Sequence, residues 1–261
     1  MIRFFLKKSF YSGWDNLIAI IGLNIPLLGL AIGGYLLAGV VASIVPLSLA
    51  ILCATAAAIG VVLVGISGCM AKVASYKSFR LSDVVSLIRE SWGHGVLFGL
   101  LVAAAVLVVS VSIPFYFKIG GFVGYLLAAV LFWAAAIVAL SLQWFLPIRS
   151  QLGGGFAVCL RKSFVIFFDN PGFSVFMFVH GALLLFVSFF IFFLVPGPSG
   201  VLLGHNEALR LRLYKYDWLE RNGDRTPRDA RRAIPWAELL EHDVETVGDR
   251  SFKDFIFPWK G

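Results

Sequence analysis

The residues in this chain that are best suited to chemistry are a few polar side chains in otherwise apolar sequence. His205, Asn206 and Glu207 follow one another in a segment that begins apolar. Asn24 and His180 each stand alone in long apolar runs. Polar and ionisable groups are costly inside a membrane, so they are candidates for function by default. We therefore predict an intramembrane polar site that draws on Asn24, His180, His205, Asn206 and Glu207.

Each of these residues also has a structural interpretation. Asn24 precedes Pro26, which removes a helix hydrogen bond, so the Asn24 amide can satisfy a freed backbone group or bond a neighbouring helix. His180 can hydrogen-bond another helix, or it can sense protons because imidazole titrates near neutral pH. If the segment around Glu207 lies on the surface rather than in the membrane, its polar residues are merely solvated.

The sequence contains none of the catalytic or metal-binding motifs that we considered. It lacks the H-E-x-x-H, G-x-x-x-x-G-K-[ST] and G-x-S-x-G patterns. Cys53, Cys69 and Cys159 are odd in number and lack C-x-x-C spacing, which argues against a disulfide framework or a zinc site. The glycines at 153–155 lack the Lys and Ser/Thr of a phosphate loop, so they predict a flexible turn. We expect a protein without enzymatic activity, cofactor or metal.

Membrane-spanning helices must position the candidate residues. The 56 residues from Asn16 to Ala71 contain no Lys, Arg, Asp, Glu or His, whereas one bilayer crossing takes about 20 apolar residues. The chain is 14% charged, against about 25% in ordinary soluble domains. We predict an all-α polytopic membrane helical bundle with five strong spans and a probable short sixth. The spans lie at about 17–42, 45–68, 94–116, 120–146 and 172–196, with the sixth at 201–217.

The sixth span rests on two opposing signals. Charged residues within it, such as Glu207 and Arg210, each cost about 2.5–3.5 kcal/mol at a helix centre, so hydropathy favours five crossings. Eight Lys and Arg residues follow soon after Gly200, and such clusters stay on the cytoplasmic side, which favours six. We favour six, with a last helix that is short, shielded by the other spans, and tilted or partly re-entrant. The alternative is an external tail whose first helix lies on the outer surface.

Charge placement gives the orientation. Ten Lys and Arg residues lie in the N-terminal segment and in the loops at 69–92 and 147–170, whereas Lys118 alone occupies the opposite turns. The positive-inside rule then places the N-terminus in the cytoplasm, and six crossings return the C-terminus to the same side of a bacterial inner membrane. The net charge of +7 is therefore topogenic and directed at anionic lipid rather than at nucleic acid.

An approximate repeat indicates three copies of an interfacial helix followed by a hairpin. Lys-Ser-Phe recurs at 8–10, 77–79 and 162–164, each time before an odd-numbered span. Between the second and third spans, apolar residues at 81, 84, 85 and 88 have the spacing of an amphipathic helix. Such a helix would lie at the cytoplasmic interface with its apolar face in lipid or on the bundle, or it would form a docking surface for a partner.

A charged tail follows the membrane domain. We divide the chain into a transmembrane helical domain at 1–218 and a tail at 219–261. Pro227 and Pro235 stand where short helices can start. The last residues are strongly aromatic, which predicts either docking on the bundle or on the aromatic belt of the membrane interface, or capture by a partner protein. The candidate partner-binding residues are Phe252, Phe255, Phe257 and Trp259.

The sequence resembles the YesL-like family of small bacterial polytopic membrane proteins. The similar features are Trp14-Asp15-Asn16, Asn24 before a proline, Trp92-Gly93 and Asp169-Asn170-Pro171. They cover roughly residues 1–220, and no catalytic residues come with the resemblance. It implies a multi-span protein that assists carbohydrate uptake systems. We expect a non-enzymatic inner-membrane accessory or scaffold protein that engages a partner membrane complex through its cytoplasmic loops and tail. The alternative is a small-solute permease or channel subunit with a polar cavity near His180, His205 and Glu207.

Overall fold

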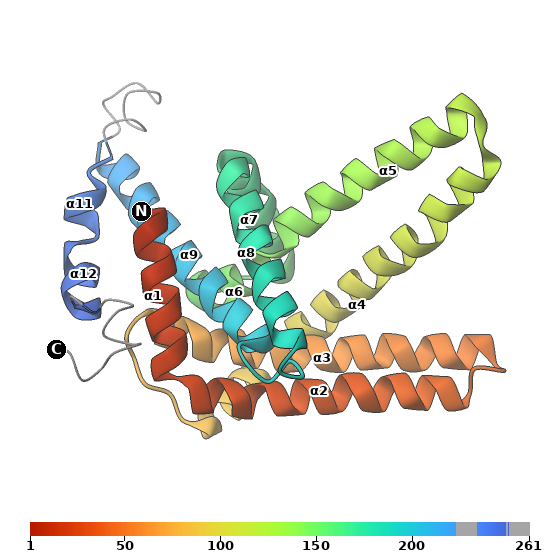
Figure 1. The fold of residues 1–261 in the computed structure, drawn as a ribbon, viewed down its shortest axis with the longest axis horizontal. Helices are drawn as coiled ribbons and strands as arrows, with labels where there is room; N and C mark the ends of the chain where they lie inside the picture. The colour runs from red at the N-terminus through yellow and green to blue at the C-terminus, as the bar shows by residue number, and fades with distance from the viewer. Residues whose placement is uncertain (223–233, 249, 251–261) are drawn as a thin grey trace.

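The computed structural model describes residues 1–222, 234–248 and 250, and these residues form an all-α bundle (Figure 1). The helices are α1 (Ile2–Asp15), α2 (Leu17–Val40), α3 (Val45–Ala74), α4 (Leu81–Ile119), α5 (Gly121–Leu142), α6 (Phe145–Leu152), α7 (Phe156–Asp169), α8 (Pro171–Phe189), α9 (Gly197–Arg221), α11 (Trp236–Leu239) and α12 (Glu241–Val247).

Five of these helices, α2, α3, α4, α5 and α8, are long and apolar enough to cross a membrane, which confirms the predicted membrane bundle. Figure 1 shows α2 and α3 side by side along the longest axis, while the α4–α5 hairpin diverges from them. The turns at the far ends of both hairpins carry Lys118 as their one cation, whereas α1, α9 and α12 lie at the opposite end.

Helices α3 and α4 pack with almost no space between their backbones. A Cβ atom at Gly95 of α4 would lie 2.5 Å from the Cα atom of Val61 in α3. A Cβ atom at Gly99 would collide with the carbonyl oxygen of Ala56, and one at Gly60 with that of Gly95. Small residues let membrane helices approach closely and gain dispersion contacts along their length. This glycine seam holds the first two hairpins together.

Helix α4 is longer than expected. The predicted amphipathic segment and the predicted span at 94–116 form one continuous helix of 39 residues. The backbone does not break at Gly93, where a Cβ atom would meet open space and where no proline ends the helix. The amphipathic side chains Leu87 and Ile88 pack against Gly68 and Gly65 of α3. The segment therefore packs on the bundle, which is one of the arrangements that the sequence predicted.

The fourth and fifth predicted spans end earlier as helices. Helix α5 stops at Leu142 and is followed by the short α6, and the glycines at 153–155 form the predicted turn into α7. Helix α8 stops at Phe189, and Phe192 and Phe193 have positive φ values in the turn that follows. That turn sends the chain back into α9, so the third hairpin consists of α8 and α9.

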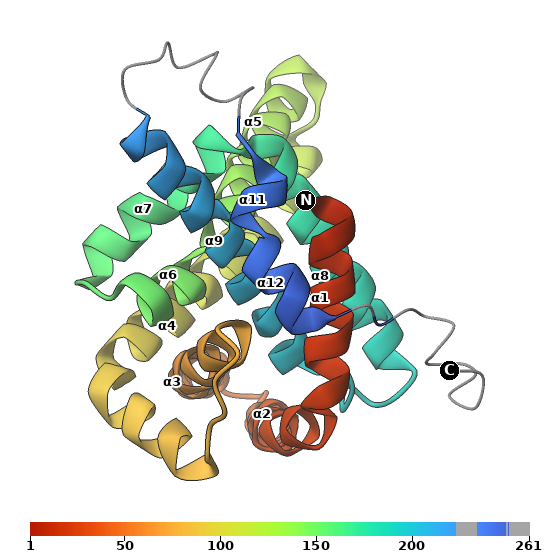
Figure 2. The same cartoon turned by 90° about the vertical axis from the view of Figure 1, so that its left-hand side faces the viewer.

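Helix α9 lies at the centre of the fold. It packs against α1, α2, α3, α6 and α8 and buries side chains on all of its faces. It is not among the five helices apolar enough to span a membrane by composition. Figure 2 shows α1, α9, α11 and α12 gathered on one side of the molecule. The N-terminal helix and the described part of the tail therefore lie on the same side of the molecule, and the sixth crossing stays a prediction.

Candidate functional site around helix α9

The three consecutive polar residues predicted as one cluster point toward three different neighbours. Successive residues on an α-helix are separated by about 100° around its axis. His205 consequently faces α8, Asn206 faces α3 and α6, and Glu207 faces α1. Because α9 is enclosed, all three are buried. The structure thus brings them to one level of the fold without assembling them into a single pocket.

His205 lies beside the second predicted histidine. A Cβ atom at Gly181 of α8 would be 3.7 Å from Nε2 of His205, and a Cβ atom at Gly204 would be 3.4 Å from the His180 ring. The His180 ring packs edge-on against Phe5, with centroids 5.3 Å apart. His205 Nε2 has no hydrogen-bond partner among the described residues. The two histidines are therefore neighbours in a mainly aromatic environment.

Asn206 is held in a fully bonded amide network. Its Nδ2 donates to the Leu202 carbonyl at 2.8 Å and to Ser67 Oγ at 3.2 Å, and its Oδ1 accepts from Gln151 Nε2 at 3.0 Å. Gln151 Nε2 also donates to the Asn206 carbonyl at 2.8 Å. Every polar atom of the Asn206 side chain is engaged, so this residue joins α9 to α3 and α6.

Glu207 is the predicted residue whose hydrogen-bonding groups are least satisfied. Its side chain is 1% exposed, and neither carboxylate oxygen has a hydrogen-bond partner of acceptable geometry among the described residues. Its neutral polar neighbours are the Ser9 and Ser12 side chains of α1, and Lys8 is the positive charge that acts on it most strongly. An unpaired buried carboxylate is costly, so Lys8 is the group that offsets its charge.

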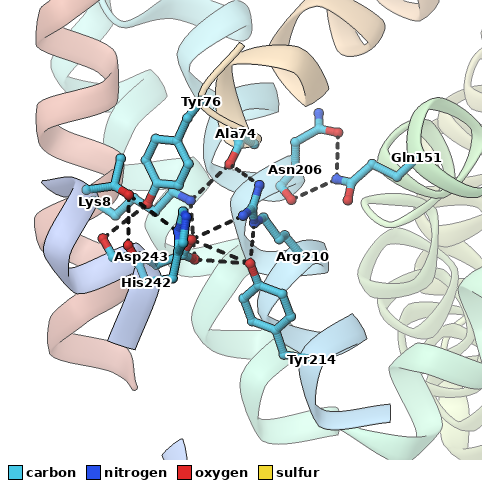
Figure 3. Close-up of polar contacts among 10 residues, drawn as sticks. Lys8, Ala74, Tyr76, Gln151, Asn206, Arg210, Tyr214, His242 and Asp243 are labelled. Atoms are coloured by element: carbon cyan, nitrogen blue, oxygen red, sulfur yellow. Dashed lines mark hydrogen bonds and ion pairs between the residues drawn. The ribbon is translucent and has the colours of Figure 1, made fainter. Parts of the chain in front are cut away.

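Asp243 of α12 is the centre of a buried ion-pair network that the sequence analysis did not identify (Figure 3). Lys8 Nζ lies 3.7 Å from one carboxylate oxygen, and Arg210 Nη2 lies 3.1 Å from the other. The Tyr214 hydroxyl lies within 3.5 Å of both. The side chains of Lys8 and Asp243 are each 1% exposed. We name Lys8, Arg210, Tyr214 and Asp243 the tail latch.

Two cations of the tail latch also cap the carboxyl end of α3. Lys8 Nζ donates to the Ala74 carbonyl at 2.9 Å, and Arg210 Nη1 donates to the same oxygen at 3.1 Å. Carbonyl groups in the last turn of a helix lack intrahelical partners and carry partial negative charge, so cations there are favourable. Two helices and the tail are thereby fixed to the carboxyl end of a third.

Burial changes the pKa values of two side chains in and around the tail latch, those of Lys8 and Tyr76. Desolvation lowers the pKa of the Lys8 ammonium, while the carboxylates of Glu207 and Asp243 oppose that shift. Desolvation also raises the pKa of the Tyr76 phenol well above its usual range, with Asp243 adding to the effect. The Tyr76 ring lies under Lys8, 4.1 Å from its Nζ to the ring centroid. Tyr76 therefore stays neutral and shields the ion pairs.

Asn24 lies away from these groups, at the turn between α8 and α9. Its Nδ2 donates to the carbonyls of Leu194 and Pro196 at 2.9 and 3.0 Å, and its Oδ1 accepts from the Ser199 backbone at 3.0 Å. The residue is fully buried. It thus satisfies backbone groups of the third hairpin, which is the structural interpretation of this residue.

A second polar cluster joins the end of α7 to α9. Lys215 Nζ lies 2.7 Å from Asp169 Oδ2 and 2.7 Å from Asn170 Oδ1. The Tyr216 hydroxyl donates to Asp169 at 2.9 Å, and Arg212 Nη1 donates to Asn170 Oδ1 at 3.1 Å. The Asp169-Asn170 pair, noted in the sequence for its position before an apolar span, binds cations of α9.

The polar residues of the bundle therefore differ in whether their side chains still have free hydrogen-bonding atoms. Asn24 and Asn206 are committed to structural bonds, whereas His205 and Glu207 keep unsatisfied atoms. The described residues contain no group of three or more metal-ligating side chains. The four predicted partner-binding aromatics lie outside the described residues, namely Phe252, Phe255, Phe257 and Trp259.

Two cavities lie beside α9, and none of the predicted site residues lines either of them. One, of about 450 Å³, lies between α3, α4, α6 and α9, with Lys72 and Arg149 in its wall. The other, of about 580 Å³, lies between the start of α1, the end of α7, α9 and α11, with Arg212 in its wall.

Comparison with known proteins adds no relative. No protein-family model matches the chain, no curated protein matches it, and no solved structure matches it.

Proposed function

We propose that this protein is a non-enzymatic accessory or scaffold protein of the bacterial inner membrane that engages a partner membrane complex through its cytoplasmic loops and tail. The observation that carries the proposal is the tail latch. Asp243 anchors the described tail to α1 through Lys8, which is as fully buried as Asp243 itself, and to α9 through Arg210, which is partly exposed. The described part of the tail, held in this way, forms a fixed surface beside α1 and α9, which lowers the ordering cost of binding a partner.

Two further features support this function. The α4–α5 hairpin diverges from the rest of the bundle (Figure 1), and large apolar side chains such as Phe122 and Trp133 are exposed along it. Such a hairpin offers faces to lipid and to the helices of a membrane partner. Asn24 and Asn206, which could have contacted a solute, are instead occupied by structural hydrogen bonds.

The resemblance to the YesL-like family is consistent with the same function. It rests on short patterns near the membrane boundary, including Trp14-Asp15-Asn16 and Asp169-Asn170-Pro171. The second pattern ends α7 and begins α8, where Asp169 and Asn170 hold cations of α9. The substrate class served by the partner complex would follow from that family's association with carbohydrate uptake.

The test is crosslinking and mild-detergent purification of the full chain and two variants of its last segment. One variant replaces all four aromatic residues with serine: Phe252, Phe255, Phe257 and Trp259. The matched control, Lys253→Gln with Asp254→Asn, alters the charges between them. We expect an integral membrane complex to co-purify with the wild type and the control and to be lost from the aromatic variant. Failure to recover a stable partner with any chain contradicts the proposal.

A solute permease or channel subunit is the second candidate, favoured by the unsatisfied atoms of His205 and Glu207. Buried acids in membrane proteins often mark solute or proton pathways. Purified protein in liposomes would then conduct protons or small sugars, and Glu207→Gln would abolish the flux while leaving the protein folded. Absence of any flux in the wild type removes this candidate and leaves the scaffold function unaffected.

A further inference from the structure

The cavity of about 580 Å³ beside α9 has the composition of an anion site. Among the described residues, its charged side chains are those of Arg3, Arg212, Lys215 and Asp169. Lys215 and Asp169 form an ion pair of 2.7 Å, so their charges offset one another. Of the described wall residues, Arg3 and Arg212 then contribute a net positive charge.

Arg212 is buried with unused hydrogen-bonding capacity. Its side chain is 6% exposed, its Nη1 donates to Asn170 Oδ1 at 3.1 Å, and its Nη2 reaches the Met1 sulfur at 3.0 Å. A thioether is a weak acceptor, and Nε has no partner among the described residues. The guanidinium therefore bonds one oxygen although it carries five N–H donors. An unsatisfied buried charge of this kind is costly unless a ligand completes it.

The guanidinium is also held rigidly in place. Its central carbon lies 3.8 Å from the Phe173 ring centroid and 5.8 Å from that of Trp236. Arginine stacked on aromatic rings presents its planar donors in a fixed direction, which suits bidentate binding of phosphate or carboxylate oxygens. The site is thus organised before a ligand arrives, and Asn170 supplies the hydrogen bond that orients it.

The other described side chains of the cavity wall are apolar. Met1, Ile2 at the start of α1, and Trp236 of α11 line it beside the arginines. The cavity is lined by residues of α1, α9 and α11, and Figure 2 shows these three helices on one side of the molecule. A basic pocket with an apolar wall suits the head group of an anionic phospholipid, and basic pockets between membrane helices bind such head groups.

We propose that this cavity binds a phosphate group, with Arg212 as its main ligand and Arg3 at its rim, and that the phosphate belongs to an anionic phospholipid such as phosphatidylglycerol. The apolar lining accommodates the glycerol and the first methylene groups of the acyl chains. Asp169 neutralises Lys215 and keeps the site from attracting a second anion.

The test uses the full chain in an uncharged detergent, with bound lipid counted by native mass spectrometry. The probes are dioctanoyl phosphatidylglycerol and its zwitterionic counterpart, dioctanoyl phosphatidylcholine. We expect one molecule of phosphatidylglycerol to bind more tightly than phosphatidylcholine. Arg212→Gln should weaken that binding about tenfold, as the loss of a charge-assisted hydrogen bond does. Arg3→Gln, at the exposed rim, should weaken it about two- to fivefold.

Three controls keep the outcome decisive. Arg161→Gln removes an exposed cation of α7 that lines neither cavity, so it should leave binding unchanged. Arg3→Gln still tests the site if Arg212→Gln does not fold, because Arg3 is exposed. Displacement of the lipid by millimolar sodium phosphate would support the phosphate site and assign it to a soluble anion. Equal binding of the two lipids by the wild type, or unchanged phosphatidylglycerol binding in both arginine variants, would overturn the proposal.

Discussion

The substitution Asp243→Asn tests whether the tail latch holds the tail to the bundle. It preserves the size of the side chain but removes a carboxylate that is 1% exposed and that lies 3.7 Å from Lys8 and 3.1 Å from Arg210. Removing one partner of a buried ion pair costs about 3–5 kcal/mol. Glu207 still faces Lys8, and Arg210 is partly exposed, so we expect a cost near the lower limit, about 3 kcal/mol.

That cost should appear as undocking of α11 and α12 before the bundle unfolds. A loss of about 3 kcal/mol raises the open population roughly a hundredfold. Hydrogen exchange of the peptide covering 236–247, measured by mass spectrometry on the detergent-solubilised protein, should accelerate by a similar factor. Peptides from α3 and α4 should keep their protection, because the glycine seam does not involve the tail.

The matched control is Asp15→Asn. Its ion pair with Arg250 is shorter, at 2.7 Å, but both side chains are about half exposed. Exposed pairs contribute roughly 0–1 kcal/mol, so this substitution should change exchange in the tail by less than about fivefold. Unchanged tail protection in Asp243→Asn, or equal effects of the two substitutions, refutes the reasoning that burial gives the tail latch its strength.

Three further predictions concern the bundle. Gly95→Ala should lower stability by about 1–3 kcal/mol in detergent unfolding, because the new Cβ atom would lie 2.5 Å from the α3 backbone; Gly93→Ala, which meets open space, should not lower it. Asn24→Leu should lower the melting temperature, since two carbonyls and one N–H at the α8–α9 turn lose partners worth about 1–3 kcal/mol each. Single cysteines introduced at Glu238 and Lys118 in a cysteine-free background should react with impermeant reagents from opposite sides of the membrane, and labelling from one side contradicts the topology.

The sequence predicted the membrane helices well because their signal is local. A run of apolar residues such as 16–71 has no alternative to crossing a bilayer, and the turns between spans follow from breaks in that run. Helix ends were less predictable. The amphipathic pattern before Trp92 suggested a separate helix, yet the hydrogen-bond ladder of α4 continues through Gly93 because neither a proline nor a competing cap interrupts it.

The sequence predicted which polar residues are buried around α9 better than it predicted which neighbours those residues face. Sequence adjacency suggested that His205 and Glu207 act together, but the helical period directs them to different neighbours. Asp243 gave no local signal, since an acid in a polar tail is usually solvated. Its burial depends on Lys8, which lies 235 positions earlier in the chain and which charge counting assigned to membrane orientation.

The enclosure of α9 determines how the protein can move. Every side of this helix, about 37 Å long, is bonded to a different element, with Ser199 tied to α2, Asn206 to α3 and α6, and Arg210 to the tail. Sliding or turning α9 by one residue would break all of these bonds together, so intermediate positions are unfavourable. Helix α9 therefore has one favourable position, and any shift of it would change the α8–α9 turn and the docking of the tail at the same time.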